Sequence, residues 1–192
     1  EQQYLPMVRR AASKHKVPAA LIFGHMKQES KNFDPLSRLD EKDATGKIWD
    51  SSFGLMQLLL GTAKGLDPNA TEMKLYDPEY SIDLGTQLIR KNLDQYNGNI
   101  KDAIAAYNAG KARKNDQGQY VNSKGVPNVQ KYVDKVYGFY VDYDKWLGHG
   151  AQTIDVSINP WLIFGFSFVL VLTVIGGGVY VSKRKNNRTL LR

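Results

Sequence analysis

Glu29 is the carboxylate best placed for acid–base chemistry, because it ends a segment whose preceding residues are mostly apolar. A carboxyl group on such a helical face is partly removed from water, and desolvation raises its pKa toward the range of a general acid. A surface glutamate at a helix end is the alternative for this residue taken alone. The residues that share its face at helical spacing are Leu21, Ile22, His25 and Met26.

The composition excludes several other kinds of chemistry. The chain of 192 residues has no cysteine, which excludes Cys nucleophiles, zinc–thiolate sites, iron–sulfur clusters and disulfides. Its three histidines, at positions 15, 25 and 149, offer no pair at a metal-ligand spacing. No phosphate-binding loop, dinucleotide fingerprint or Gly-x-Ser-x-Gly elbow occurs. We therefore expect neither a metal nor a cofactor.

The net charge of +7 is unevenly distributed. Five basic residues lie in the last ten positions, 183–192, whereas residues 1–150 carry a net charge of only +3. An excess of basic residues can indicate an anionic partner, but the main body is close to balanced. We expect no nucleic acid partner for it, and at most weak attraction to an anionic cell wall.

Apolar periodicity predicts that residues 1–150 form a mostly helical domain. Ser81 and Asn99 are suitable N-caps, and Gly110 is a suitable helix stop. Residues 31–53 lack a clear period and are predicted to be a loop without a convincing strand pair. The helices are expected at residues 4–15, 18–30, 81–97, 99–109 and 127–146, and a short helix is expected after Gly54. Residues 111–126 are expected to form a polar loop with at most a small hairpin near 119–122.

An uncharged run lies between residues 156 and 182. A helix of about 20 apolar residues spans the hydrocarbon core of a bilayer, and Trp161 and Tyr180 stand where aromatic rings favour the headgroup level. A buried core helix is the alternative. We expect a linker at 151–159, a single transmembrane helix at 160–182 that contacts the lipid bilayer through residues 161–181, and a basic tail at 183–192. Because positive residues stay cytoplasmic, the main domain is expected on the outer or periplasmic side.

Four short motifs follow one another in the main body. They are Gln28-Glu29-Ser30 with Phe33 and Pro35, Gly54-Leu55-Met56-Gln57 with Thr62-Ala63, Ala105-Ala106-Tyr107-Asn108-Ala109-Gly110, and Asn128 with Tyr132, Val133 and Val136. Together they resemble the lytic transglycosylases of the soluble type, glycoside hydrolase family 23, which share a goose-type-lysozyme-like fold. The resemblance covers about residues 5–145, so the expected fold class is a mainly α, lysozyme-like domain followed by the membrane helix.

The resemblance implies an enzyme that acts on the glycan strands of peptidoglycan. Glu29 would protonate the oxygen between N-acetylmuramic acid and N-acetylglucosamine and then act as a base. The C6 hydroxyl of the muramic acid would attack the anomeric carbon and leave a 1,6-anhydro end. Tyr107 would reach Glu29 and orient it.

The resemblance also implies residues that bind the substrate. Met56 and Gln57 would line the sugar cleft, and Asn108 would hold the loop or contact the glycan. Ser30 and Ser37 occupy the positions of the family's serines after the acid. For Ser30 the alternative is a hydroxyl that bonds a backbone carbonyl at the helix end.

Several alternatives stay open at the level of sequence. The segment at 38–53 is longer than is usual in the family and contains Asp50. If Asp50 faced Glu29 across about 6.5–9.5 Å, water attack with inversion would make the protein a lysozyme-type hydrolase. A non-catalytic wall-binding or assembly module is a further alternative. The setting is either a membrane-containing phage or remodelling of the wall for a secretion or conjugation apparatus.

Overall fold

A computed structural model of the protein describes residues 1–42 and 44–148. The linker, the membrane helix and the basic tail predicted for residues 151–192 lie outside the described residues. Within the described part, every helix is too short or too polar to cross a lipid bilayer.

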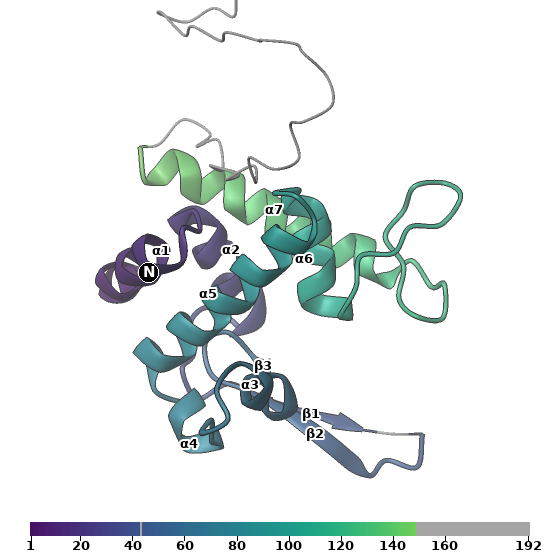
Figure 1. Ribbon diagram of the computed structural model, residues 1–192, viewed down its shortest axis with the longest axis horizontal. Helices are drawn as coiled ribbons and strands as arrows, with labels where there is room; N and C mark the ends of the chain where they lie inside the picture. Colours follow the sequence, from purple (N-terminus) through teal and green to yellow (C-terminus); the bar gives the residue numbers. More distant parts are fainter. Residues whose placement is uncertain (43, 149–192) are drawn as a thin grey trace, which may run out of the picture. The chain divides into compact units, whose positions relative to one another are not determined.

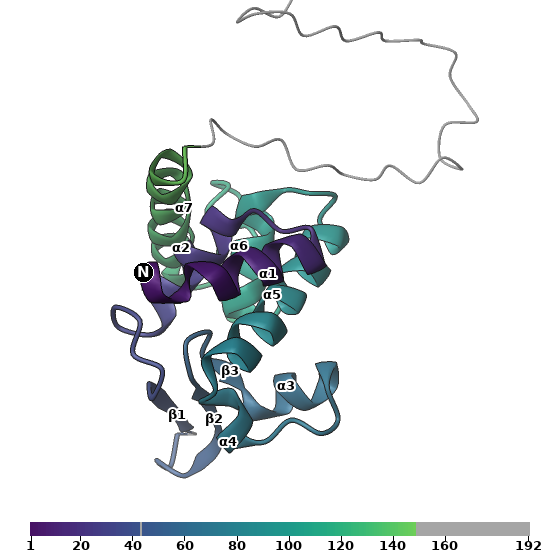
Figure 2. The same ribbon diagram turned by 90° about the vertical axis from the view of Figure 1, so that its left-hand side faces the viewer.

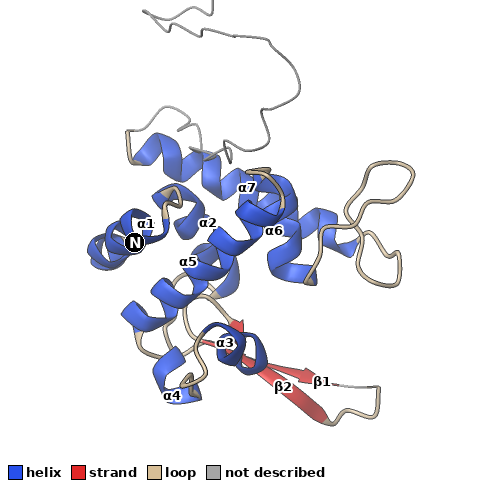
Figure 3. Cartoon of the chain, viewed as in Figure 1, coloured by secondary structure: helices blue, strands red, loops and turns tan. Residues whose placement is uncertain are grey.

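Helices dominate the described chain (Figure 3), as the periodicity predicted. A single 3-10 turn, Gln2–Tyr4, precedes them. The elements follow in the order α1 (Leu5–His15), α2 (Ala19–Glu29), β1 (Arg38–Lys42), β2 (Ile48–Phe53), β3 (Leu58–Leu59), α3 (Leu60–Leu66), α4 (Glu72–Leu75), α5 (Pro78–Gln95), α6 (Ile100–Ala109) and α7 (Asn128–Trp146).

The helix α2 lies at the centre of the domain. Residues 20–26 are all buried, so the helix is enclosed on every side rather than amphipathic. It packs against α1, α5 and α7. At Gly24, an added Cβ would lie 3.1 Å from the carbonyl oxygen of Val136 and 3.2 Å from the backbone nitrogen of Tyr140. The missing side chain therefore lets the backbones of α2 and α7 approach closely.

The ends of the later helices follow from capping. Asn99 accepts a hydrogen bond from the backbone N–H of Asp102 at 3.1 Å, and Gly110 ends α6 with φ of 71°, so both sequence predictions are confirmed. Ser81 was the wrong cap for α5. Asp77 accepts from the N–H of Tyr80 at 2.8 Å, so the helix begins one turn earlier with a proline in its first turn.

Residues 31–53 are not a plain loop, which corrects the prediction. The strands β1, β2 and β3 form an antiparallel sheet in that order, with Arg38 opposite Phe53 and Glu41 opposite Asp50. The first strand reads Arg-Leu-Asp-Glu-Lys. Such a sequence lacks the alternation of apolar and polar residues that reveals a half-buried strand. One face carries only the polar residues Arg38, Asp40 and Lys42, and the other carries Glu41 beside the single apolar residue Leu39.

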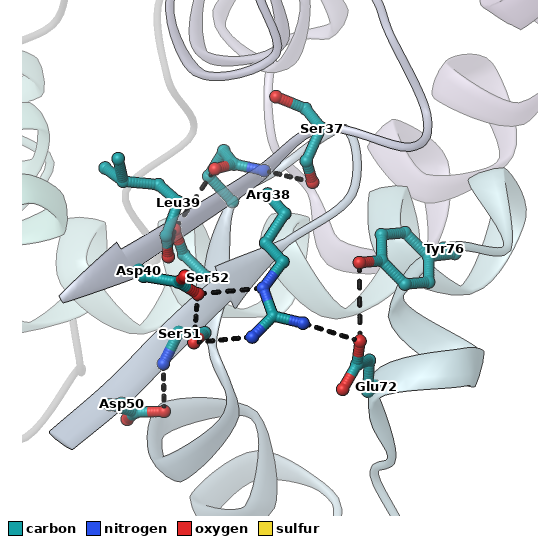
Figure 4. Close-up of polar contacts among 10 residues, drawn as sticks. Ser37, Arg38, Leu39, Asp40, Asp50, Ser51, Ser52, Glu72 and Tyr76 are labelled. Atoms are coloured by element: carbon teal, nitrogen blue, oxygen red, sulfur yellow. Dashed lines mark hydrogen bonds and ion pairs between the residues drawn. The ribbon is translucent and has the colours of Figure 1, made fainter. Parts of the chain in front are cut away.

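Arg38 holds that polar face together (Figure 4). Its guanidinium donates to Asp40 at 2.8 Å and to Glu72 at 3.2 Å, and the hydroxyl of Ser51 donates to the same oxygen of Asp40 at 2.8 Å. Since Glu72 belongs to α4, the guanidinium connects the sheet to that helix. Figures 1 and 2 both show the strands beside α3 and α4 at one end of the domain and α7 at the opposite end.

Candidate active site

Glu29 is the last residue of α2, and its side chain is only partly exposed. The hydroxyl of Tyr132, on α7, donates a short hydrogen bond to its carboxylate. Burial raises the pKa of Glu29 to about 7, and the bond from Tyr132 opposes that rise without cancelling it. The group therefore changes between acid and carboxylate close to neutral pH, as a residue that must both give and take a proton requires.

The helix end that carries Glu29 is fixed by local bonds. The backbone N–H of Ser30 donates to the carbonyl of Met26 at 3.0 Å, and its hydroxyl donates to the same oxygen at 2.6 Å. The next three residues, 31–33, all have positive φ, which turns the chain sharply away from the helix. The ring of Phe33 then packs against that of Phe23 at a centroid distance of 6.2 Å. The hydroxyl of Ser30 is thus buried against the backbone.

Tyr107 lies next to Glu29 without orienting it in the way expected. Its hydroxyl donates to the carbonyl oxygen of Met56 at 2.8 Å, whereas Tyr132 makes the direct bond to the acid. Burial and the nearby charge of Glu29 raise the pKa of Tyr107 well above its usual range. Tyr107 therefore stays a neutral phenol and connects α6 to the turn at 54–57.

The turn at 54–57 depends on Gly54 and Gln57. Gly54 has φ of +74°, and a Cβ there would lie 1.9 Å from the carbonyl oxygen of Leu75. The amide nitrogen of Gln57 donates to the carbonyls of Ser37, at 2.8 Å, and Gly54, at 2.9 Å. Its amide oxygen accepts from the hydroxyl of Ser52 at 3.1 Å. Gln57 thereby joins the turn to β2 and to the chain before β1.

The remaining candidates differ in accessibility. Met56 is fully buried, and Ser37 is buried and contributes its carbonyl to the turn. Asn108 is exposed at the end of α6, beside Tyr107. Asp50 is partly buried, and its carboxylate accepts from the N–H groups of Ser51 at 2.7 Å and Gly61 at 3.3 Å. Because Gly61 is in the first turn of α3, Asp50 neutralises the start of that helix.

Two residues near Glu29 were not assigned a role from sequence. Tyr132 belongs to the fourth motif, and its place in that motif was the only indication in the sequence that it lies near the site. His25 shares a helical face with Glu29, and its Nδ1 lies 3.3 Å from the hydroxyl of Tyr132. Burial lowers the pKa of His25 to about 3, so the imidazole is neutral. Its ring centroid lies 4.4 Å from that of Tyr107.

A cavity in the described part of the chain lies apart from Glu29 and the residues that contact it. Across residues 1–42 and 44–148, no group of three His, Cys, Asp or Glu side chains is placed to hold a metal ion. The cavity, of about 570 Å³, lies between α1 and α5. Its charged side chains pair with one another, Arg10 with Glu79 and Lys14 with Asp83, each at 2.7 Å. The cavity contains none of the candidate residues, so its volume does not identify the site.

Comparison with known proteins gives consistent matches. Residues 6–129 match the family model described as the transglycosylase SLT domain. The chain is 33% identical over 122 residues to membrane-bound lytic murein transglycosylase C from Yersinia pestis (strain Pestoides F), a match that covers 56% of this chain and 31% of the relative. The same protein from Yersinia pseudotuberculosis serotype O:1b matches equally. The chain thus spans about a third of the length of these relatives.

Two solved structures share the fold. One is an inactive mutant of lytic transglycosylase Slt from Pseudomonas aeruginosa, with a TM-score of 0.57 and 27% identity, covering 78% of this chain and 25% of that one. The other is the 70 kDa soluble lytic transglycosylase from Escherichia coli, with a TM-score of 0.58 and 24% identity, covering 76% of this chain and 25% of that one.

Proposed function

The chain belongs to the transglycosylase SLT domain family, whose model matches residues 6–129, and we propose that it is a peptidoglycan lytic transglycosylase. The observation that carries the proposal is the environment of Glu29, where burial raises the pKa to about 7. A lytic transglycosylase needs one carboxyl group that is neutral when the substrate binds and ionised after the first proton transfer. The Pseudomonas relative is described as inactive when a glutamate is replaced by glutamine.

Glu29 performs both proton transfers in the proposed reaction. Its acid form protonates the glycosidic oxygen between N-acetylmuramic acid and N-acetylglucosamine, while positive charge develops at the anomeric carbon. The resulting carboxylate then takes the proton from the C6 hydroxyl of the muramic acid. The oxygen of that hydroxyl attacks the anomeric carbon, so the product ends in a 1,6-anhydro ring and no water is consumed.

The role of Asp50 favours the anhydro product over hydrolysis. An inverting hydrolase requires a second carboxylate that is free to activate water. Both oxygens of Asp50 already accept a backbone hydrogen bond, one from Ser51 in β2 and the other from Gly61 in the first turn of α3. These bonds give Asp50 a structural role, which supports Glu29 as the single acid–base group of the proposed reaction.

Substrate contacts are proposed for the accessible residues around Glu29. Asn108 is exposed and adjacent to Tyr107, so its amide is free to hydrogen-bond the glycan. Gln57 is partly exposed and held in place by three hydrogen bonds. Met56, Ser30 and Ser37 support these groups from buried positions rather than through their own side-chain contacts.

We also propose that the chain acts close to a membrane. The run at 160–182 is uncharged and the tail that follows is basic, which is the pattern of a single span with a cytoplasmic C-terminus. The Yersinia relatives are named membrane-bound. An enzyme held in this way would open the wall locally, either for a membrane-containing phage or for the cell's own secretion or conjugation machinery.

Product analysis of digested peptidoglycan tests the proposed function. The full chain should release soluble fragments whose mass spectra show 1,6-anhydro-muramic ends. Glu29→Gln, which removes the titratable group with little change in shape, should bind the same material and release no fragments. Reducing ends in place of anhydro ends would make the protein a hydrolase. Binding without release by the wild-type chain would make it a wall-binding module.

A further inference from the structure

The hydroxyl of Tyr132 lies between the carboxyl group of Glu29 and the imidazole of His25, each of which can accept a hydrogen bond. It contacts the carboxylate of Glu29 on one side and Nδ1 of His25, at 3.3 Å, on the other. A phenol has a single proton, so it can donate to only one of these groups at a time. The choice between them must depend on whether Glu29 already holds a proton of its own.

The surroundings of this contact leave few other groups to influence it. His25 is 1% exposed, and it belongs to the same helix as Glu29. The titratable groups that face the pair from neighbouring helices are Tyr107, on α6, and Tyr132, on α7. Both phenols have a pKa raised well above the usual range by burial, so both keep their protons. The protonation state of Glu29 is then the variable that decides the direction of the hydrogen bonds.

We propose that His25 is a positioning residue that stabilises the acid form of Glu29 through the hydroxyl of Tyr132. This inference rests on the proposed function, which requires Glu29 to begin the reaction as a neutral acid. In the acid form without substrate, Glu29 donates to the oxygen of Tyr132, and Tyr132 donates to Nδ1 of His25. When the glycan binds, the carboxyl proton must turn from Tyr132 to the glycosidic oxygen before it is transferred. The imidazole proton is then on Nε2.

After Glu29 has given its proton to the glycosidic oxygen, the bonds reverse. The hydroxyl of Tyr132 rotates and donates to the new carboxylate, where a charge-assisted bond is stronger than the one to a neutral imidazole. No proton leaves Tyr132 or His25 in this exchange. With its proton on Nε2, His25 has a donor for Nδ1 only while Glu29 is protonated, so this tautomer favours the acid form and leaves the carboxylate form without its contribution. The other tautomer would donate from Nδ1 to the hydroxyl of Tyr132 and favour the carboxylate, so a rise in the pKa of Glu29 in His25→Phe would overturn the proposal.

The burial of His25 suits this role. An imidazolium would carry protons on both nitrogens and could not accept from Tyr132. Burial lowers the pKa of His25 to about 3 and keeps the ring neutral across the range in which Glu29 titrates. The ring is therefore neutral over the pH range in which Glu29 titrates, and its Nε2–H tautomer leaves Nδ1 available as an acceptor.

The test is a carboxyl titration of Glu29 by carbon NMR in the full chain in detergent, with the signal assigned by its loss in Glu29→Gln. His25→Phe keeps an aromatic ring against Tyr107 and removes Nδ1. We expect the pKa of Glu29 to fall by about half to one unit, the equivalent of one net hydrogen bond. The alkaline fall in peptidoglycan cleavage should move to lower pH by the same amount.

Two further variants separate the hydrogen bond from packing. His25→Asn places an amide oxygen near the former Nδ1 and should restore most of the wild-type pKa. In a Tyr132→Phe background the hydroxyl that connects Glu29 with His25 is absent, so His25→Phe should cause no further shift in the pKa of Glu29. Tyr137→Phe removes a hydroxyl from α7 outside this cluster and serves as the matched control.

The outcomes distinguish this inference from the proposed function. An unchanged pKa of Glu29 in His25→Phe, or an equal shift in the Tyr132→Phe background, would overturn the role of His25 even if the protein cleaves peptidoglycan. The expected pKa shifts in a protein without cleavage would support the role of His25 and refute the proposed function. If His25→Phe does not fold, His25→Leu, which also removes Nδ1, takes its place with and without Tyr132→Phe and provides the same decision.

Discussion

Glu29 and His25 respond to burial in opposite directions, although they lie on one face of one helix. Burial penalises whichever form is charged, so the pKa of the carboxyl rises to about 7 and the pKa of the imidazole falls to about 3. Both groups are consequently neutral over much of the acid range. A pair of neutral groups is less costly to bury than either ion would be.

This pairing predicts how stability depends on pH. A carboxyl whose pKa rises on folding destabilises the fold as pH rises from 4.5 through about 7, because the folded state retains a proton that the unfolded state has released. A histidine whose pKa falls on folding destabilises the fold as pH drops from 6.5 through about 3. Between pH 4.5 and 6.5 the contributions of the two groups to the free energy of unfolding change with pH in opposite directions and nearly cancel.

Single variants should reveal each slope. In Glu29→Gln the free energy of unfolding should rise with pH between 4.5 and 6.5, by up to about 1.4 kcal/mol per pH unit relative to wild type. In His25→Phe it should fall with pH by a similar amount. Urea unfolding of the full chain in detergent, followed by tryptophan fluorescence, measures both, and the double variant should return to the wild-type slope. Parallel pH profiles for wild type and both single variants would contradict the prediction.

Sequence patterns singled out Glu29 but not the residue that hydrogen-bonds to it. Glu29 is visible because its helical face is apolar and because it opens an ordered set of motifs. The bond from Tyr132 joins residues 103 positions apart. It depends on the close approach of α2 and α7 at Gly24, which no local pattern encodes. The serine at position 30 has a hydroxyl that bonds a backbone carbonyl, the alternative that sequence alone left open.

At the level of elements, the long helices were predictable, whereas the sheet and the four-residue helix α4 were not. Helix ends at Asn99 and Gly110 follow from local capping, which requires only neighbouring residues. The strand β1 is stabilised by pairing with β2 and by the contacts of Arg38 with Asp40 and Glu72, which are distant in sequence or depend on the sheet itself. Exposed ion pairs of this kind stabilise weakly, so backbone pairing must supply most of the stability of the strand.

The substitution Gly54→Ala tests how far the turn at 54–57 depends on one residue. In Gly54→Ala the new Cβ would lie 1.9 Å from the carbonyl oxygen of Leu75 and 2.9 Å from the hydroxyl of Ser81, at a φ of +74°. The left-handed backbone alone costs about 1–2 kcal/mol for a residue other than glycine. Overlap with a main-chain atom adds to that cost, so we expect a loss of more than about 2 kcal/mol of stability.

Gly118→Ala is the matched control for that prediction. Gly118 has φ of +75° and no atom within 4 Å of an added Cβ, so it isolates the cost of the backbone conformation. Urea unfolding should show a clearly smaller loss in Gly118→Ala than in Gly54→Ala. The Gly54 variant should also cleave peptidoglycan more slowly, because Gln57 and the carbonyl of Met56 belong to the displaced turn. Equal losses in the two variants would show that the contact with Leu75 is unimportant.

At the level of the whole molecule, the chain divides into parts that differ in charge and hydropathy. Residues 1–150 carry a net charge of +3, and five further basic residues follow the uncharged run. The family model ends at residue 129, so the run and the tail are additions to the domain that it describes. Anchoring and cleavage should therefore be separable by substitution in the full chain.

Two arginines in the middle of the run provide that separation. In the double variant Leu170→Arg and Leu172→Arg, each charge should disfavour insertion by about 2.5–3.5 kcal/mol. We expect this protein to leave the membrane fraction on alkaline extraction while it still releases anhydro fragments from isolated peptidoglycan at the wild-type rate. The matched control, Leu190→Arg with Leu191→Arg, adds the same charges to the basic tail and should stay in the membrane fraction. Retention of the first variant in the membrane would show that residues 160–182 are not the anchor, because a spanning helix cannot accept two central charges without a partner.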